Sequence, residues 1–224
     1  MITLGVMARA PLPGHCKTRI ARTHGDDFAA ALYGAMLKDT LTQLATLPVR
    51  HMLLGAPDDG MTTLRDYATP PWTLHPQEGT DLGARMLSAF QRWASPEKPF
   101  VICGSDAPLL PVDELAANLT RLHEPRTALI GPSSDGGYCL LGLPRPEPLL
   151  FSDMPWSTPR VREITCHRLR ALQYNVISLS ETFDVDESAD VERLAEALSL
   201  SPERAPASAR FLWGDSPQRL SPRQ

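Results

Sequence analysis

Charged residues gather in a loop that follows the first apolar run of the chain, residues 2–7. The loop reads Ala8-Arg9-Ala10-Pro11-Leu12-Pro13-Gly14-His15-Cys16-Lys17-Thr18-Arg19. Its three cations, Arg9, Lys17 and Arg19, could converge on an anion, and backbone N–H groups would add to the positive field. The GxxxxGK[ST] spacing of a P-loop is absent. The alternative interpretation is a surface loop with solvated cations.

A first carboxylate, Asp106, follows the apolar run 100–104 within Ser105-Asp106-Ala107-Pro108. A carboxylate at the carboxyl end of a strand is well placed to hold Mg²⁺, which takes one or two protein carboxylates together with phosphate oxygens of a substrate. Alternatively, such an aspartate only caps the turn that follows. The sequence leaves both interpretations open at this position.

Two further acidic segments follow. Asp135 precedes Gly136 and Gly137 between two apolar runs, where Asp-Gly is a common hairpin signal and paired glycines also let the backbone approach a ligand closely. The second reading would leave Asp135 exposed to that ligand. Near the end, Asp186 or Asp184 would supply a second carboxylate to the metal, although acidic residues before a helix also complement its dipole.

Alternating strands and helices would position these segments. We expect strands at 2–7, 49–55, 100–104, 127–130, 138–143 and 175–179, helices at 27–47, 82–93, 112–122, 158–172 and 189–198, and a short helix and strand within 58–76. Thr158 and Pro159 would begin their helix as N-cap and first residue. This pattern predicts a single-domain α/β fold over 1–198, with a mostly parallel sheet between helical layers and ligands beyond the strands' carboxyl ends.

Composition limits the classes of function. The 224 residues carry a net charge of -4, from 22 Lys and Arg against 26 Asp and Glu. An acidic chain is unsuited to bulk nucleic-acid binding, and no apolar run approaches the roughly 20 residues that span a membrane. The four cysteines form no CxxC pair, so neither a zinc site nor a disulfide framework is indicated. We expect a cytoplasmic protein whose residues 199–224, rich in Pro, Ser and Arg, form a loose tail that Phe211, Leu212 and Trp213 pin in place.

The order of these motifs resembles the DUF2064 family, also described as radical-SAM/selenodomain-associated transferase 1. The shared pattern covers roughly residues 2–198. It comprises Met7-Ala8-Arg9-Ala10-Pro11, Pro13-Gly14, Lys17-Thr18-Arg19, Gln77-Glu78-Gly79, Asp81-Leu82-Gly83, Arg85-Met86, Gly104-Ser105-Asp106-Ala107-Pro108-Leu109, Gly131-Pro132, Asp135-Gly136-Gly137-Tyr138, Trp156-Ser157-Thr158 and Asp184-Val185-Asp186. Two positions depart from it: the family often has Cys at Ala107, and Thr-Pro-Glu-Asp at Glu187-Ser188-Ala189-Asp190.

The resemblance implies a nucleotide-diphospho-sugar transferase (GT-A) fold, similar to molybdenum-cofactor and phospholactate nucleotidyltransferases. By similarity, Arg9 and Lys17 would contact donor phosphates, and Asp106 and Asp186 would hold Mg²⁺ or Mn²⁺. Lys17, Asp106 and Asp135 form the expected catalytic set. The expected substrate-binding set is Arg9, Gly14, Arg19, Gly83, Arg85, Gly136, Gly137 and Trp156.

Several functions fit these residues. Three cations in one loop suit a triphosphate, which favours nucleotidyl transfer from a nucleoside triphosphate to a small acceptor. Glycosyl transfer from a nucleotide sugar is the alternative, because some family members are labelled arsenosugar-pathway glycosyltransferases, and Asp135 would then act as general base. A non-catalytic nucleotide-binding module would not need paired metal ligands. A thiol enzyme that uses Cys16 beside Lys17 lacks a partner histidine.

Overall fold

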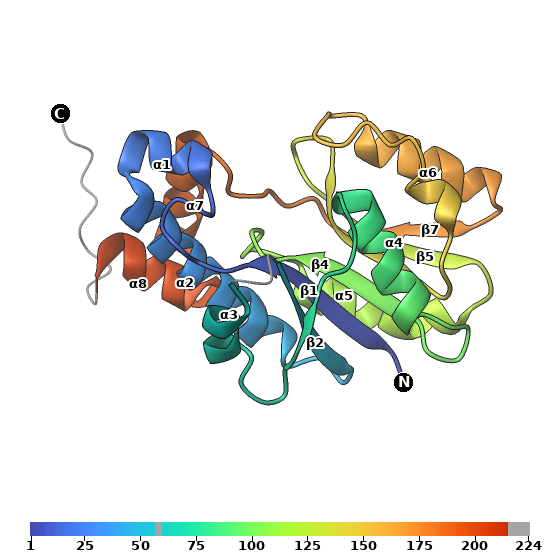
Figure 1. Ribbon diagram of the computed structural model, residues 1–224. Helices are drawn as coiled ribbons and strands as arrows, with labels where there is room; N and C mark the ends of the chain where they lie inside the picture. Colours follow the sequence, from blue (N-terminus) through green and yellow to red (C-terminus); the bar gives the residue numbers. More distant parts are fainter. Residues whose placement is uncertain (57–59, 215–224) are drawn as a thin grey trace.

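A seven-stranded sheet forms the centre of the protein, whose structure, a computed structural model, describes residues 1–56 and 60–214 (Figure 1). The strand order is β3-β2-β1-β4-β6-β5-β7. The parallel strands are β1 (Thr3–Arg9), β2 (Arg50–Ala56), β3 (Thr73–Pro76), β4 (Phe100–Gly104), β5 (Thr127–Pro132) and β7 (Asn175–Ser178). Only β6 (Tyr138–Leu143) runs antiparallel to its neighbours β4 and β5. The predicted mostly parallel, mixed sheet is confirmed.

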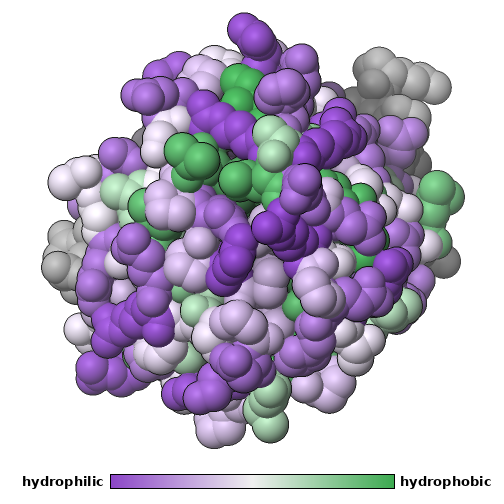
Figure 2. Space-filling model, turned by 90° about the vertical axis from the view of Figure 1, so that its right-hand side faces the viewer, coloured by the Kyte–Doolittle hydropathy of each residue, from purple (hydrophilic) through white to green (hydrophobic). Residues whose placement is uncertain are grey.

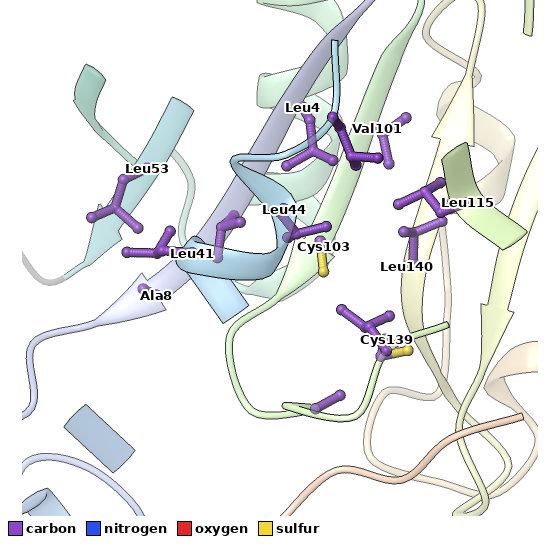
Figure 3. Packing of buried hydrophobic residues seen from close by; sticks show 14 of the residues in the cluster. Leu4, Ala8, Leu41, Leu44, Leu53, Val101, Cys103, Leu115, Cys139 and Leu140 are labelled. Atoms are coloured by element: carbon purple, nitrogen blue, oxygen red, sulfur yellow. The ribbon is translucent and has the colours of Figure 1, made fainter. Parts of the chain in front are cut away.

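Helices cover both faces of the sheet, because successive side chains of a strand point to opposite faces. On one face, α2 (Asp26–Leu44), α3 (Met61–Tyr67), α5 (Val112–Asn118) and the 3-10 helix η2 (Leu119–His123) pack against Leu4, Val6 and Ala8 of β1. Figure 3 shows this cluster, with the sulfur atoms of Cys103 and Cys139 among its apolar side chains. The other face is covered by α4 (Leu82–Trp93) and α6 (Val161–Ala171).

A second helical group lies beyond α2, on the left in Figure 1. It consists of α1 (Thr18–His24), α7 (Ser188–Leu200), the 3-10 helix η4 (Pro202–Arg204) and α8 (Pro206–Trp213). Ile20 of α1, Met36 of α2 and Leu198 of α7 are fully buried in its core, together with Ala205 and Ala209. The prediction of a loose tail is therefore wrong up to Trp213, and residues 215–224 lie outside the described part of the chain.

Two predicted helices differ from the observed ones, and α1 was not predicted. The helix expected at Thr158 begins at Val161, because Ser157 has a φ of 62° and the Thr158 hydroxyl donates to the Pro155 carbonyl at 2.8 Å instead of capping. The helix expected over 112–122 divides into α5 and η2. A 3-10 helix, η3 (Pro148–Leu150), follows β6.

One face of the molecule, seen from the side, is mostly polar (Figure 2). Figure 2 shows the face on the right of Figure 1, near α6 and β7, where hydrophilic residues predominate and hydrophobic ones gather in the upper part. Of the helices in the described ranges, none has the length and hydropathy needed to cross a membrane.

Candidate active site

A cleft of about 870 Å³ opens beyond the carboxyl ends of β1 and β4. The strand order reverses between these two strands, which is where open α/β sheets usually bind ligands. The wall combines segments from the whole chain: the end of β1, the 16–19 loop, the end of β4, the β5–β6 hairpin, the segment 156–161 and residues 184 and 186. The predicted location of the site beyond the strand ends therefore coincides with a cleft.

A backbone contact brings the late acidic segment beside Asp106. The Val185 amide donates to the Asp106 carbonyl at 2.9 Å, and the Val185 side chain is fully buried. Because alternate residues of an extended chain face opposite ways, Asp184 and Asp186 both line the cleft while Val185 enters the helical core. This local geometry brings the Asp184 and Asp186 carboxylates close to Asp106.

The Lys17 ammonium lies between two of these carboxylates. Its Nζ donates to Asp106 Oδ2 at 3.0 Å and to Asp186 Oδ1 at 2.6 Å, and only 8% of the side chain is exposed. Burial alone would lower the pKa of Lys17, but Asp106 and Asp186 raise it well above its ordinary value. The ammonium is therefore charged throughout the physiological pH range.

Asp184 is the most deeply placed carboxylate of the cleft. Burial raises its pKa to about 8, and the neighbouring Asp106, Asp135 and Asp186 carboxylates contribute in the same direction. Within the described residues, its buried Oδ1 has no hydrogen-bond partner. A buried, unpartnered carboxylate oxygen beside other carboxylates is costly unless a cation or a proton compensates it.

Tyr33 and Ser105 form hydrogen bonds beside the site. The sequence did not predict either of them as a site residue. The Tyr33 hydroxyl and Ser105 Oγ are hydrogen-bonded at 2.7 Å, and the Arg9 amide donates to the Tyr33 oxygen at 3.0 Å. Burial raises the pKa of Tyr33 to about 12. These bonds tie α2 to the ends of β1 and β4. In the sequence, Tyr33 belongs to the apolar stripe of a helix, and no signal distinguishes it from a core residue.

The β5–β6 hairpin carries Asp135 to the rim of the cleft, where its side chain is exposed. Its Oδ1 accepts from the Gly137 amide at 2.8 Å. Gly136 has a φ of 87°, and a Cβ there would lie 2.2 Å from the Pro159 carbonyl oxygen. Both predicted readings of this segment thus hold in part: the turn requires glycine, and Asp135 faces the cleft.

Arg85 and Trp156 also line the cleft. Gly83 lies beneath the Trp156 indole, since a Cβ at this position would lie 2.8 Å from Trp156 Nε1. Gly14 shapes the loop with a φ of 76°. Gly14, Gly83 and Gly136, which were predicted to bind substrate, are not among the described residues that line the cleft. They contribute instead to the shape of the backbone and to packing.

The three cations of the first loop do not converge on one point. Arg9 and Arg19 line the cleft with exposed side chains, and Arg19 pairs with Glu187 at 3.2 Å. Glu187 caps α7 in a capping box with Asp190, so the acidic residues before this helix serve the helix as well as the cleft. Burial raises the pKa of the Cys16 thiol, which argues against a thiolate nucleophile.

The residues present fit a divalent cation. Asp106 and Asp186 reach the same ammonium, and the unpartnered Asp184 Oδ1 is buried beside them. In the described ranges, no group of three or more His, Cys, Asp or Glu side chains forms a metal site unaided. Mg²⁺ does not require one, because it is usually held by one or two carboxylates together with water and substrate phosphates.

Comparisons with known proteins give the same fold. A crystal structure of a "putative nucleotide-diphospho-sugar transferase" from Desulfovibrio desulfuricans G20 matches with a TM-score of 0.83 and 29% identity, over 94% of this chain and 93% of that chain. The 4-diphosphocytidyl-2C-methyl-D-erythritol synthase of Anaerococcus prevotii matches with a TM-score of 0.56 and 9% identity, over 88% and 96% of the two chains.

A CMP:2-keto-3-deoxy-manno-octonic acid synthetase complexed with CTP matches with a TM-score of 0.54 and 8% identity, over 89% of this chain and 98% of that chain. At such identities these two likenesses concern the fold alone. No curated protein matches the chain. The family model of an uncharacterized protein conserved in bacteria, DUF2064, matches residues 40–158, more than half of the 224 residues. The chain belongs to the DUF2064 family.

Proposed function

We propose that this protein is a metal-dependent transferase that uses a nucleotide-activated donor, with nucleotidyl transfer from a nucleoside triphosphate as the favoured reaction. One observation carries the proposal. Asp106 and Asp186, 80 residues apart in the sequence, meet at the Lys17 ammonium in a cleft at the reversal of strand order. Binding of an uncharged ligand would not need a buried ammonium and two carboxylates gathered at one point of the cleft.

In the favoured reaction, an acceptor oxygen forms a bond to the α-phosphorus as the bond to the leaving pyrophosphate breaks. Negative charge builds on the pyrophosphate, and the Arg9 and Lys17 cations would stabilise it from the β1 side of the cleft. Asp106 and Asp186 would hold Mg²⁺ or Mn²⁺, which when bound supplies further charge neutralisation at the phosphates. Positioning and electrostatics therefore account for most of the expected rate enhancement.

Asp135 would serve the acceptor. It lies on the hairpin rim, exposed and facing the same cleft as Asp106. A carboxylate in this position can accept the proton of an attacking hydroxyl. Trp156 and Arg85, which line the same cleft, would orient a small acceptor through an aromatic contact and a cation.

Glycosyl transfer from a nucleotide sugar is the second candidate, and one comparison favours it. The similar structure from Desulfovibrio desulfuricans G20 is that of a "putative nucleotide-diphospho-sugar transferase", at 29% identity. Asp135 could also act as general base toward a sugar acceptor. A non-catalytic nucleotide-binding module is the third candidate, and the concentration of five aspartates on the cleft wall argues against it.

Thermal unfolding with Mg²⁺ against panels of nucleoside triphosphates and nucleotide sugars tests the proposal. A ligand present at 100 times its Kd stabilises the folded protein by about 2.7 kcal/mol. Metal-dependent stabilisation by a triphosphate alone would support nucleotidyl transfer and identify the base. A preference for nucleotide sugars would support glycosyl transfer, and no stabilisation by either panel would contradict the proposed donor.

A further inference from the structure

Lys17 occupies the position that a cation shared by Asp106 and Asp186 would take. Its Nζ contacts one oxygen of each carboxylate, at 3.0 and 2.6 Å, with 8% of its side chain exposed. A divalent ion bound to the same two carboxylates would lie within a few ångströms of the ammonium. Like charges at such a distance repel strongly in a partly buried site. The ammonium and the metal therefore exclude one another from this position.

The backbone at Lys17 directs the ammonium to this position. Lys17 lies immediately before α1 with φ 45° and ψ 46°. This is the left-handed region, which residues other than glycine rarely adopt. Such a conformation is retained only where the surrounding contacts over-determine it. The four-carbon stem of lysine nevertheless has several rotatable bonds and carries a compact charge at its end. The residue can therefore keep its backbone position while its ammonium moves to another acceptor.

An alternative acceptor would be provided by the donor. Arg9 and Arg19 line the same cleft as Lys17, where phosphates would bind under the proposed function. A phosphate oxygen offers the Lys17 ammonium a charge-assisted hydrogen bond comparable to the one it gives up. Contact with the phosphates would release Asp106 and Asp186 for the metal.

We propose that Lys17 competes with the divalent cation for Asp106 and Asp186 and that donor phosphates relieve this competition, so that metal and donor bind as a coupled pair. This inference rests on the proposed function only in taking the site's ligands to be a metal and a phosphate-bearing donor. Coupling of this kind is reciprocal: the metal strengthens donor binding by the same factor by which the donor strengthens metal binding. Lys17 is then the residue that couples the two ligands.

The first experiment observes the ammonium directly in the full-length wild-type protein. The sequence has only three lysines, Lys17, Lys38 and Lys98, and the latter two are exposed, so ¹H–¹⁵N spectra of the lysine NH₃⁺ groups provide internal controls. Without metal, Lys17 should give a slowly exchanging signal. On Mg²⁺ titration this signal should shift or vanish, and its midpoint should match that of the backbone amides near Asp106. The NH₃⁺ signals of Lys38 and Lys98 should stay unchanged.

The second experiment measures Mn²⁺ affinity by electron paramagnetic resonance, without nucleotide. Lys17→Met should bind Mn²⁺ at least about tenfold more tightly than the wild type, within the usual range of coupling between ligands. Arg19→Gln is the matched control: it removes a cation of the cleft that contacts Glu187 instead of Asp106 or Asp186, and should change Mn²⁺ affinity far less. If Lys17→Met fails to fold, as circular dichroism would show, Lys17→Gln replaces it.

The outcomes separate this inference from the proposed function. Mg²⁺ binding near Asp106 with an unchanged Lys17 signal, or equal Mn²⁺ affinity in Lys17→Met and the wild type, would overturn the competition and leave a metal-dependent transferase standing. Absence of metal binding in both the wild type and Lys17→Met would overturn the inference together with the metal dependence of the proposed function.

Discussion

Asp184 is the residue whose charge is least compensated by its surroundings. Its pKa is raised from 3.8 to about 8 by burial and by Asp106, Asp135 and Asp186. The folded protein therefore binds a proton that the unfolded chain has already released at neutral pH. The resulting contribution to stability is fully present below about pH 4 and is lost as the pH rises toward 8.

This shift predicts the pH dependence of an Asp184→Asn variant. Asparagine cannot ionise, so with EDTA present its stability relative to the wild type should increase as the pH rises from about 5 to about 8.5. Urea unfolding of both proteins across this range measures the difference and cancels the titration of groups that do not interact with Asp184. A difference that does not change with pH would show that Asp184 is not protonated in the folded protein.

Asp106 allows a test of the metal site at the level of one atom. Asp106→Asn removes a negative charge but keeps the shape of the side chain, which lies beyond the end of β4 and is 34% exposed. The fold should persist, while the Mg²⁺-dependent part of the stabilisation by a nucleotide should vanish. Asp66→Asn, at an exposed position of α3, is the control and should retain it. Full metal-dependent stabilisation in Asp106→Asn would remove Asp106 from the site.

The sequence predicted which residues would lie together at the strand ends better than it predicted their contacts. Lys17, Asp106, Asp135 and Asp186 all line one cleft, as strand-end positions in an α/β fold should. The contact of Lys17 with carboxylates instead of an anion was not predictable, because it joins residues 169 positions apart and depends on the packing of α7. Tyr33 was missed because its hydroxyl acts from within an apolar helical stripe.

At the scale of elements, α8 shows how a remote residue can stabilise a helix. Asp39 of α2 is buried, and its two carboxylate oxygens accept from the Ala207 and Ser208 amides at 2.8 and 2.7 Å. These amides belong to the first turn of α8, where backbone donors have no partner within the helix. A side chain of a different helix thus provides the cap that the local sequence lacks.

Asp39→Ala should therefore destabilise the protein by about 1–3 kcal/mol, the usual cost of leaving buried donors unpaired. Urea unfolding measures the loss. Asp66→Ala, at an exposed position, should change stability by less than about 0.5 kcal/mol. Equal stability of the Asp39→Ala and wild-type proteins would mean that α8 docks through its apolar contacts alone.

The elements that the sequence revealed are those with a clear apolar pattern of their own. The predicted ranges 82–93, 100–104 and 138–143 coincide with α4, β4 and β6, because each has a continuous apolar run or a clear helical period. Over 206–213 the sequence shows no helical period, because its large apolar residues, Phe211, Leu212 and Trp213, are consecutive and the cap comes from Asp39. The missed helix α1 has seven residues and one buried side chain, Ile20, which is too short a pattern for periodicity to detect.

At the scale of the molecule, the site links the sheet to the second helical group. Lys17 precedes α1 and Asp186 lies just before α7, whereas Asp106 belongs to the end of a sheet strand. A ligand in the cleft should therefore slow hydrogen exchange in residues 15–20 and 184–190 together. Mass spectrometry with Mg²⁺ and a stabilising nucleotide measures this effect. The amides of α3, which contributes no described residue to the cleft wall, should not change, and protection confined to one of the two segments would contradict the link.

The separation of Lys17 and Asp186 along the chain has a consequence for synthesis. Their contact spans 169 residues, so a ribosome must release almost the entire α/β fold before the ammonium meets its second carboxylate. Until then, Lys17 and Asp106 belong to a growing chain whose cleft lacks one wall. A truncated translation product would therefore lack a competent site, even where its first strands had already paired.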